Sequence, residues 1–436
     1  MFRIISILLL FSFSVVHSQK VAIDTNVSLD NLVKTHLFEG CIEVSNVSSS
    51  VNGSVSNITS FGTFSKSNSN FPFSNGIILS TGNANSAGNT DISEDLNEGD
   101  DGWGTDPILA TDLGISNSVN ATSIEFDFTS AINKIKFEYI LASEEYLKSE
   151  YICDNKDLFV LLIKEASSTG PYINIATVGS ENSLIKPGNI HTEIFGFCLP
   201  ENESYFDGYA IGDTNFEGRT TAITTIATIV PNTLYHAKLI IADDNDENFD
   251  TAIFLKKSII LPEVNLGKDV STCATTVELN AEVEMTSVNF DWYLDDELVQ
   301  ANGTSSYTAN ETGKYTVKIS IPLNGLECEN EDSINVTLSS VQSIDSISDY
   351  TLCDANGDGK EFFDLSTKNT EVEDAAPPAT YDISYHNTLE KAQADQDRIL
   401  VPFENVSNPQ VVYVRLEDET GCLSYEPINL IINPVP

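Results

Sequence analysis

The stretch Ile241-Ala-Asp-Asp-Asn-Asp-Glu-Asn-Phe-Asp-Thr-Ala-Ile-Phe-Leu255 places an acidic segment between two apolar runs of strand-like composition, Tyr235–Ala242 and Thr251–Leu255. Its carboxylates are Asp243, Asp244, Asp246, Glu247 and Asp250. Like charges packed at one end of a buried strand pair repel one another, and a hard divalent cation with oxygen ligands offsets that repulsion. The stretch therefore predicts a structural calcium (Ca²⁺) site, with a solvated acidic hairpin as the alternative.

The charge of the chain argues against two classes of partner. The 436 residues include 22 basic and 65 acidic side chains, for a formal net charge of −43. Nucleic acid and anionic membranes are repelled by such a field, so we expect neither as a partner. A hydrophobic fraction of 41% is sufficient for packed cores, and the length predicts roughly two to four domains.

The N-terminus has the pattern of a secretory signal peptide. Arg3 precedes the apolar run Ile4–Val16, and Val16 and Ser18 fit a cleavage site before Gln19. We assign residues 1–18 to this signal and expect a secreted, extracellular protein. No other stretch approaches the apolar length of a membrane span, so we expect no membrane insertion.

Strand-like segments dominate the rest of the chain, separated by clusters of Asn, Gly, Ser and Asp. They cover residues 76–80, 123–128, 134–141, 158–163, 222–230, 235–242 and 252–260. Helical periodicity is confined to Asp30–Phe38 and Thr388–Asp397, the latter with Thr388 as N-cap. This pattern predicts an all-β protein: a β-sandwich or jelly-roll-like head followed by two smaller immunoglobulin-like (Ig-like) β-sandwich modules.

The domain boundaries follow from Pro262 and the short linker after it. We expect a head at 19–262, an Ig-like module at 263–341 and an adhesin-type β module at 342–436. In the second of these, Cys273, Trp292, Tyr315 and Cys328 follow in the order typical of an immunoglobulin-like sandwich. In the immunoglobulin fold the second cysteine follows the tyrosine after two residues, whereas Cys328 lies thirteen residues after Tyr315. A bridge from Cys328 would therefore join different strands from those of the immunoglobulin bridge. We expect Trp292 and Tyr315 to pack in the core.

Seven cysteines are widely spaced, and without a CxxC motif they do not indicate a zinc ribbon or a thioredoxin-like site. In an oxidising compartment, two pairs that each bracket one module are the simplest bridges. The predicted disulfides are Cys273–Cys328, Cys353–Cys422 and Cys153–Cys198. Cys41 is then expected to be a small buried residue.

The third module begins with a second candidate for calcium. Asp354, Asn356 and Asp358, followed by Gly359, match the first half of a calcium loop, in which alternate side chains point inward. The twelfth position of such a loop should be acidic, but it is Leu365. The neighbouring Asp364 could serve instead, and a tight turn without an ion is the alternative.

Residues from about 28 to 261 resemble the choice-of-anchor L domain, a family of secreted bacterial surface modules. The matching stretches are Gly76–Gly82, Asp106–Ala110, Ile124–Phe128, Phe137–Tyr146, Asp157–Phe159 and Tyr235–Leu255. The modules after it look like the tandem repeats of large adhesin-like proteins from outer-membrane bacteria, often exported by type IX secretion. The resemblance implies a protein secreted or attached at the outer-membrane surface, and it names no reaction.

The family's anchor is a C-terminal sorting signal of variable type. The sequence ends at Asn433–Pro436, which resembles an inter-module linker, and it contains no sorting domain, LPxTG motif or terminal apolar span. We therefore expect further modules or a C-terminal anchor beyond this segment.

Glu144 and Glu145 fall in the strongest of these matching stretches. Adjacent residues of a strand project to opposite faces, so the two cannot form an acid/base pair with each other. One of them could join Asp243, Asp246 or Asp250 around a calcium ion. A solvent-facing turn and a catalytic role with a distant partner are the alternatives.

Motifs for catalysis are not found: the sequence has no HExxH, GxSxG or GxxxxGK[ST] pattern. Trp103, in a loop rich in Asp and Gly, could stack on a sugar or fold into the sandwich. We therefore expect a non-enzymatic, calcium-stabilised adhesin-like protein that binds an extracellular glycan or protein surface. The alternative is a secreted glycan-active hydrolase or carbohydrate-binding protein that uses carboxylates of the head.

Overall fold

The computed structural model describes residues 19–99, 103–147, 152–153, 157–285, 288–324, 326–339, 344, 346–376 and 380–434. The predicted signal peptide at 1–18 lies outside them. The chain forms two compact units, Met1–Pro262 with Ile321–Cys328, and Glu263–Ser320 with Glu329–Pro436. Strands predominate in both, so the predicted all-β class is confirmed. Within the described residues, no helix has both the length and the apolar character needed to cross a membrane.

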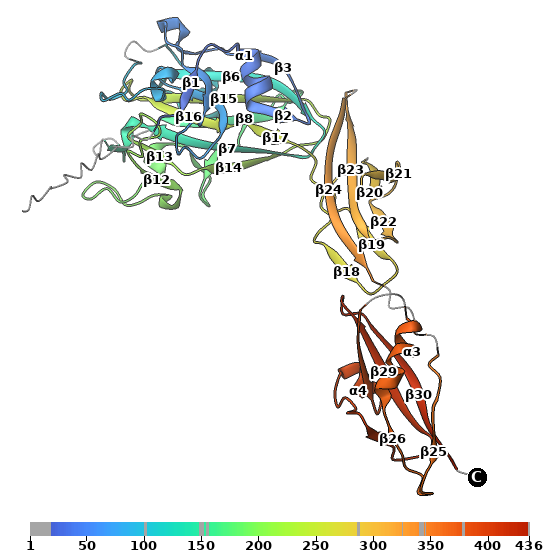
Figure 1. The fold of residues 1–436 in the computed structure, drawn as a ribbon. Coiled ribbons are helices and arrows are strands. Elements are labelled where there is room, and N and C mark those ends of the chain that lie inside the picture. The colour runs from blue at the N-terminus through green and yellow to red at the C-terminus, as the bar shows by residue number, and fades with distance from the viewer. Residues whose placement is uncertain are drawn as a thin grey trace, which may run out of the picture. The chain divides into compact units, whose positions relative to one another are not determined.

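Two sheets form the head (Figure 1). The larger has the order β1-β4-β5-β16-β7-β13-β12, with β14 also paired to β7. Its strands are β1 (Ala22–Asp24), β4 (Phe61–Ser65), β5 (Asn75–Ser80), β7 (Lys134–Ser143), β12 (Phe206–Tyr209), β13 (Gly218–Thr220), β14 (Ile223–Thr228) and β16 (Thr251–Lys256). The smaller has the order β3-β6-β15-β8-β9. Its strands are β3 (Ile42–Ser48), β6 (Ser118–Ser130), β8 (Leu158–Glu165), β9 (Ile173–Asn174) and β15 (Tyr235–Asp244).

Short elements complete the head. The strand pairs are β2 (Phe38–Gly40) with β17 (Ser258–Ile260), in parallel, and β10 (Thr177–Val178) with β11 (Ser183–Leu184). The helical elements are α1 (Leu29–Asn31), η1 (Leu32–Leu37), η2 (Gly53–Ser56), η3 (Ala84–Ala87), α2 (Pro107–Leu113), η4 (Glu144–Leu147), η5 (Pro187–Asn189) and η6 (Glu203–Tyr205). The helix predicted at Asp30–Phe38 is thus a short α-turn continued by a π-helical turn.

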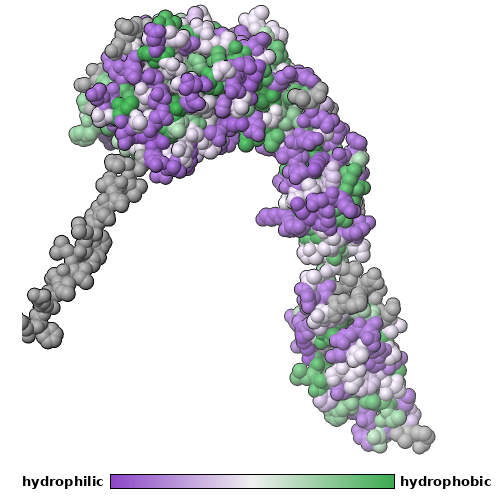
Figure 2. Space-filling model, turned by 45° about the horizontal axis from the view of Figure 1, so that its top comes forward, coloured by the Kyte–Doolittle hydropathy of each residue, from purple (hydrophilic) through white to green (hydrophobic). Residues whose placement is uncertain are grey.

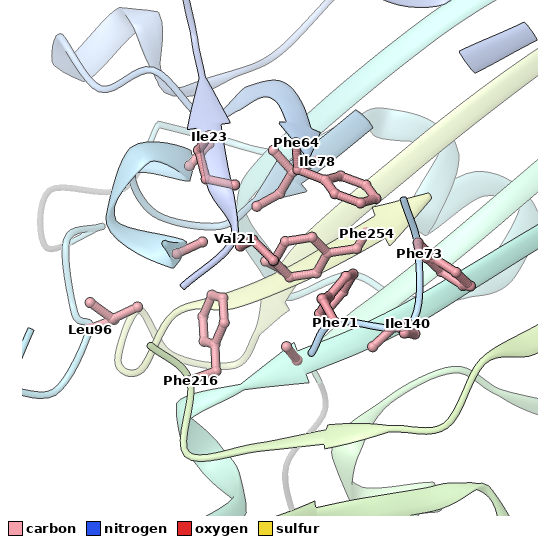
Figure 3. Close-up of a cluster of buried hydrophobic side chains, with 14 residues drawn as sticks. Val21, Ile23, Phe64, Phe71, Phe73, Ile78, Leu96, Ile140, Phe216 and Phe254 are labelled. Carbon is pink, nitrogen blue, oxygen red and sulfur yellow. The ribbon is translucent and has the colours of Figure 1, made fainter. Parts of the chain in front are cut away.

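The larger sheet is buried on both faces. Tyr139 of β7 contacts Phe159 of β8 in the smaller sheet, with ring centroids 5.3 Å apart. On its other face, Phe254 of β16 packs against Phe64 and Phe71 with ring centroids 5.4 and 4.9 Å away (Figure 3). Because successive residues of a strand point to opposite faces, this double burial explains the continuous apolar run of β16.

The acidic segment between β15 and β16 is not the turn of a hairpin. β15 pairs with β6 and β8 in the smaller sheet, whereas β16 pairs with β5 and β7 in the larger one. The alternative of an acidic hairpin is therefore wrong, and the segment crosses from one sheet to the other. Its carboxylates consequently meet the ends of strands from both sheets.

The second unit holds two smaller sandwiches. The first has a sheet of order β18-β24-β23-β20-β21 and a pair β19-β22. Its strands are β18 (Val270–Thr272), β19 (Val277–Asn280), β20 (Asn289–Leu294), β21 (Glu297–Gln300), β22 (Ser306–Ala309), β23 (Gly313–Leu323) and β24 (Leu326–Leu338). The segment Ile321–Cys328, which contains the end of β23 and the start of β24, is grouped with the head. Trp292 and Tyr315 are fully buried in the core of this first sandwich, as predicted.

The second sandwich of this unit has a sheet of order β25-β30-β29-β27 and a pair β26-β28. Its elements are β25 (Tyr350–Asp354), β26 (Phe362–Phe363), η7 (Leu365–Lys368), α3 (Asn369–Asp374), β27 (Tyr381–His386), α4 (Leu389–Ala394), β28 (Phe403–Glu404), β29 (Gln410–Asp418) and β30 (Leu423–Pro434). The Thr388 side chain accepts from the Lys391 amide, so its predicted role as N-cap of α4 is confirmed.

The disulfides differ from two of the three predicted pairings. The structure forms Cys153–Cys198, as expected, but also Cys41–Cys328 and Cys273–Cys422, and leaves Cys353 free. The predicted Cys273–Cys328 and Cys353–Cys422 bridges are wrong because the first strand of each module pairs in parallel with the last one. Each expected pair is therefore separated by most of the length of β24 or β30, roughly 35 Å at about 3.3 Å per residue.

Candidate functional site

Three buried aspartates from distant positions lie at one end of the head sandwich. Asp243 is near the end of β15, Asp157 directly precedes β8, and Asp250 directly precedes β16. Their exposed fractions are 1, 3 and 2%. Strand ends of both sheets therefore bring carboxylates into the protein interior at this point.

Polar neighbours hold each carboxylate in place. Asn120 Nδ2 donates to Asp243 Oδ2 over 2.9 Å, and Thr251 Oγ1 donates to Asp157 Oδ2 over 2.7 Å. Oδ1 of Asp243 is buried and accepts no hydrogen bond from the described residues. A buried carboxylate oxygen without a donor is open to a proton or a cation.

Asp157 and Asp243 form one electrostatic pair. Burial, with a smaller contribution from the charge of Asp246, raises the pKa of Asp157 to about 8, although the hydrogen bond from Thr251 acts in the opposite direction. Burial also raises the pKa of Asp243 well above its usual range, and the charge of Asp157 adds to this effect. Two such carboxyls are stable at neutral pH when they bind a proton or a cation.

Asp250 depends on a close backbone approach. The Glu98 amide donates to both of its oxygens, over 3.0 and 3.3 Å. A Cβ atom at Gly82 would lie 1.9 Å from Asp250 Oδ2. Only glycine leaves room for the carboxylate there, which gives a physical reason for the glycine that ends the stretch Gly76–Gly82.

A second acidic group surrounds Glu144. Its carboxylate and those of Asp95 and Glu217 have ligand atoms within 4.8 Å of one another, the only such group of three among the described residues. Two oxygen ligands of one calcium ion, each at 2.3–2.6 Å from it, lie at most about 5 Å apart. The spacing of this triad is therefore compatible with one calcium ion.

The sequence suggested that Glu144 and Glu145 lie in a strand, but in the structure they follow the end of one. β7 ends at Ser143, and both glutamates begin the 3₁₀ turn η4, where they are 1 and 2% exposed. The amide of Glu144 donates to the backbone oxygen of Asp250, which links the triad to the three aspartates. The amide of Glu145 donates to Ser143 Oγ.

The five head residues named as candidate calcium ligands are therefore divided. Asp243 and Asp250 lie with Asp157, and Glu144 lies with Asp95 and Glu217, whereas Glu145 is buried outside that triad and Asp246 is exposed. Reasoning from local spacing missed Asp95, Asp157 and Glu217, because they are brought in from other strands and loops. The one available signal was Asp157, which begins a stretch that resembles the family.

The loop after β25 is arranged as a tight turn. Asp354 accepts from the amides of Gly357 and Gly359, over 2.6 and 3.1 Å, and Asp358 accepts from the amide of Lys360 over 2.9 Å. Asn356 and Asp358 also bond to each other. These side chains are engaged with their own loop, which corresponds to the tight-turn alternative.

Trp103 is a core residue, which contradicts the idea of a sugar-stacking side chain. Its exposed fraction is 6%, and its indole N–H donates to the Ala121 carbonyl over 2.8 Å. Its amide donates to Asn120, the residue that also bonds Asp243. The ring thus supports the acidic end of the sandwich and has no open face for a ligand.

A different loop presents apolar side chains to solvent. Phe195, Phe197 and Leu199 are 92, 62 and 79% exposed. The disulfide Cys153–Cys198 fixes this segment, and the Ile194 and Cys198 backbones bond across its turn. Hydrophilic residues predominate on the face of the molecule shown in Figure 2, with smaller hydrophobic areas among them. Sequence analysis did not single out this loop, although Phe-Gly-Phe-Cys-Leu is unusually apolar for a turn.

Solved structures similar to this chain share little overall geometry with it. Sidekick-1 immunoglobulin domains 1–4 are 9% identical over 51% of this chain and 64% of that one, with a TM-score of 0.15. Three N-terminal domains of the bacteriophage RB49 outer capsid protein Hoc are 12% identical over 72% and 94%, with a TM-score of 0.26. Fibronectin(III)-like modules of Clostridium thermocellum CbhA are 13% identical over 40% and 95%, with a TM-score of 0.17. Matches at such TM-scores carry no argument about function.

Family models match most of the chain, whereas no curated protein matches it. Residues 349–436 match the Flavobacterium inter-domain disulphide bond domain, and residues 20–259 match the choice-of-anchor L domain. Together with three disulfides, these modules indicate an extracellular, adhesin-like surface protein. The chain belongs to the choice-of-anchor L domain family.

Proposed function

We propose that this chain is a non-enzymatic protein that attaches to an extracellular glycan or protein surface through its head, with the Ig-like modules as spacers. The observation that carries the proposal is the loop Thr192–Leu199, the apolar loop hereafter, which exposes Phe195, Phe197 and Leu199 on a braced backbone. Exposed apolar side chains grouped in this way mark interaction sites.

The disulfide supplies the second part of the argument. A free loop would lose conformational entropy on binding, whereas a loop already fixed by Cys153–Cys198 loses less. Aromatic side chains are enriched at the buried centres of protein interfaces and also stack on sugar rings. The apolar loop therefore combines a rigid frame with contact residues suited to either surface.

The test is binding of the fluorescently labelled chain to a glycan array and to immobilised collagen, fibronectin and mucin. We expect the variant Phe195→Ser/Phe197→Ser to lose at least about tenfold in affinity, which corresponds to 1.4 kcal/mol or more, with an unchanged melting temperature. The matched control is Leu400→Ser/Val406→Ser, which changes residues 84 and 80% exposed in the second unit. Equal losses in both variants, or cleavage of an array glycan by the chain, would contradict the proposal.

We also propose that calcium orders the acidic end of the head. The pair Asp157 and Asp243 and the triad Asp95, Glu144 and Glu217 supply carboxylate oxygens, the ligands that calcium prefers. A calcium ion bound by the pair or by the triad would offset the repulsion among the carboxylates that hold it. It would also hold the crossing between β15 and β16 in one conformation.

Thermal unfolding of the full chain, first with excess EDTA and then with millimolar calcium, tests this role. An ion that binds only the folded state stabilises it by about 2.7 kcal/mol at a hundredfold excess over its dissociation constant. We expect Asp157→Asn/Asp243→Asn or Asp95→Asn/Glu217→Gln to reduce the shift. The exposed Glu181→Gln, which removes a carboxylate elsewhere on the head, is the control and should preserve it. The same melting temperature with EDTA and with calcium would refute the proposal.

Protons should compete with calcium at the aspartate pair. The pKa of Asp157 rises on folding from 3.8 to about 8, so between these values the folded state binds more protons than the unfolded one. Without calcium, the stability contributed by this group therefore falls as pH rises through that range. We expect calcium to raise the melting temperature more at pH 8 than at pH 5, and Asp157→Asn to reduce the difference. A calcium effect independent of pH would exclude this pair as the site.

A further inference from the structure

A buried histidine faces one sulfur of the disulfide within the head. His191 is 2% exposed, and its Nδ1 lies 2.7 Å from the Thr192 carbonyl oxygen. A carbonyl oxygen can only accept a hydrogen bond, so Nδ1 carries the proton of the neutral ring and Nε2 keeps a lone pair. Nε2 lies 3.9 Å from Cys198 Sγ, the sulfur bonded to Cys153. The ring therefore directs a proton acceptor at that sulfur.

His191 and Cys198 belong to one hairpin, whereas Cys153 comes from an earlier part of the chain. The backbones of His191 and Glu201 bond to each other in both directions, and those of Ile194 and Cys198 do the same near the turn. These hydrogen bonds do not involve the disulfide. We therefore expect Cys198 to stay beside His191 when the bridge to Cys153 opens.

The other two disulfides differ in exposure and in chemistry. Cys41 and Cys328 are 2 and 5% exposed, so their sulfurs are shielded from an external thiol. In the remaining bridge, Cys422 Sγ lies 3.2 Å from Thr420 Oγ1, a hydroxyl that does not act as a base at neutral pH. The bridge beside His191 is half-buried at both of its cysteines and has an imidazole at one sulfur. It is therefore the disulfide best suited to exchange.

We propose that the disulfide Cys153–Cys198 exchanges with an external thiol and thereby links the head covalently to a thiol-bearing molecule. The thiol attacks Cys153 Sγ, the bond between the two cysteine sulfurs breaks, and a new disulfide forms between Cys153 and the attacking sulfur. Cys198 leaves as a thiolate, and His191 Nε2 takes up the proton of the attacking thiol. One disulfide replaces another, so the step needs no oxidant or reductant.

The position of His191 decides which sulfur leaves. A thiol departs faster when its thiolate is stabilised, and a neighbouring imidazolium supplies that stabilisation. Because the imidazole contacts the Cys198 sulfur, Cys198 is the better leaving group and Cys153 is the sulfur that is attacked. Phe195 and Phe197 are exposed on the same hairpin and favour a thiol carried on an apolar peptide. The exchange itself does not depend on attachment through the apolar loop.

The test is incubation of the full chain with millimolar glutathione at pH 6.5 in oxygen-free buffer, with acid quenching and peptide mapping by mass spectrometry. We expect glutathione on Cys153 and a free thiol on Cys198, formed at least about tenfold faster than the other two disulfides open. Equal rates for all three disulfides, no adduct, or glutathione on Cys198 would overturn the proposal.

A parallel reaction identifies the source of the thiol. A synthetic peptide with one cysteine between leucines replaces glutathione at the same concentration and pH. Faster formation of the adduct with this peptide assigns the site to protein thiols, whereas faster formation with glutathione assigns it to small thiols.

The variant His191→Asn tests the role of the ring. Asparagine retains an N–H that can donate to the Thr192 carbonyl, but it places no base beside Cys198. We expect exchange at pH 6.5 to slow by about tenfold, and the difference to shrink toward pH 9, where thiols are largely ionised without a neighbouring base. A substitution that only loosened the hairpin would expose the disulfide and speed its exchange. The direction of the change therefore separates the two causes.

The matched control is His236→Asn, which changes a histidine bonded to Asp127 on the smaller sheet. This variant should exchange at the rate of the original chain. Exchange in His191→Asn that is as fast as in the original chain, or faster, would overturn the proposal.

Discussion

The head and the second unit place their charged side chains differently. Buried carboxylates of the head include Asp106, Asp157, Asp213, Asp243 and Asp250. In the described part of the second unit no carboxylate is buried, and its buried charged side chains are Lys368 and Arg415. Burying a charge costs free energy unless a partner or an ion offsets it. The acidity of the second unit therefore serves solubility, whereas the acidity of the head includes groups that require a partner.

The two tryptophans allow each region to be followed separately. Trp103 lies in the head and Trp292 in the second unit, and the chain has no others. With Trp292→Phe the fluorescence during chemical denaturation reports on the head, and with Trp103→Phe it reports on the second unit. The comparison between the regions can thus be tested by paired substitutions.

The largest effect should come from a buried ion pair of the head. Arg219 Nη1 donates to both oxygens of Asp213, over 2.6 and 2.7 Å, and the two side chains are 6 and 1% exposed. Arg219→Ala leaves a buried charge without its partner, so we expect a loss of about 3–5 kcal/mol in the free energy of unfolding, read through Trp103. The control Arg398→Ala breaks an exposed pair of the second unit and should cost about 0–1 kcal/mol. Similar losses of stability in Arg219→Ala and Arg398→Ala would show that the two regions do not differ in how strongly they depend on charge pairs.

A smaller effect is expected at the close approach beside Asp250. Gly82→Ala puts a Cβ atom against Asp250 Oδ2, so the carboxylate must move, at a cost of about 1–3 kcal/mol. We also expect a weaker stabilisation by calcium, measured from the melting temperature with and without EDTA. The exposed Gly170→Ala is the control. A full calcium response in Gly82→Ala would show that Asp250 does not support the ion.

A third, smaller effect is expected in the second unit, at a hydrogen bond between uncharged groups. Tyr315 Oη donates to the Glu311 carbonyl over 3.0 Å. Tyr315→Phe removes this bond, so we expect a loss of about 1 kcal/mol, read through Trp292, without any change in the calcium response. A loss above that of Gly82→Ala would reverse the expected ranking.

The smallest effect should be at the loop after β25. Asp354→Asn keeps an acceptor for the Gly357 amide and loses only the longer bond from the Gly359 amide in an exposed loop, so we expect a loss of about 0.5 kcal/mol. The calcium-dependent shift of the second unit, followed by calorimetry, should be the same before and after the substitution. A shift that disappears in Asp354→Asn would restore the calcium loop predicted from Asp354, Asn356 and Asp358.

The sequence by itself determined the features that depend on neighbouring residues. The apolar runs of β15 and β16, the Thr388 cap and the buried positions of Trp292 and Tyr315 follow from local composition and spacing. The family also followed from ordered stretches of sequence. Such features can be predicted because periodicity and capping act within a few residues.

Only the tertiary structure decided which distant residues meet. Cys41 bonds to Cys328 across 287 residues of sequence, and Glu144 meets Asp95 and Glu217 from separate loops. The parallel pairing of first and last strands excluded two reasonable disulfides, and the crossing between sheets divided the expected calcium ligands. Local patterns fix which residues form strands, but the order of strands in a sheet depends on packing over the whole domain.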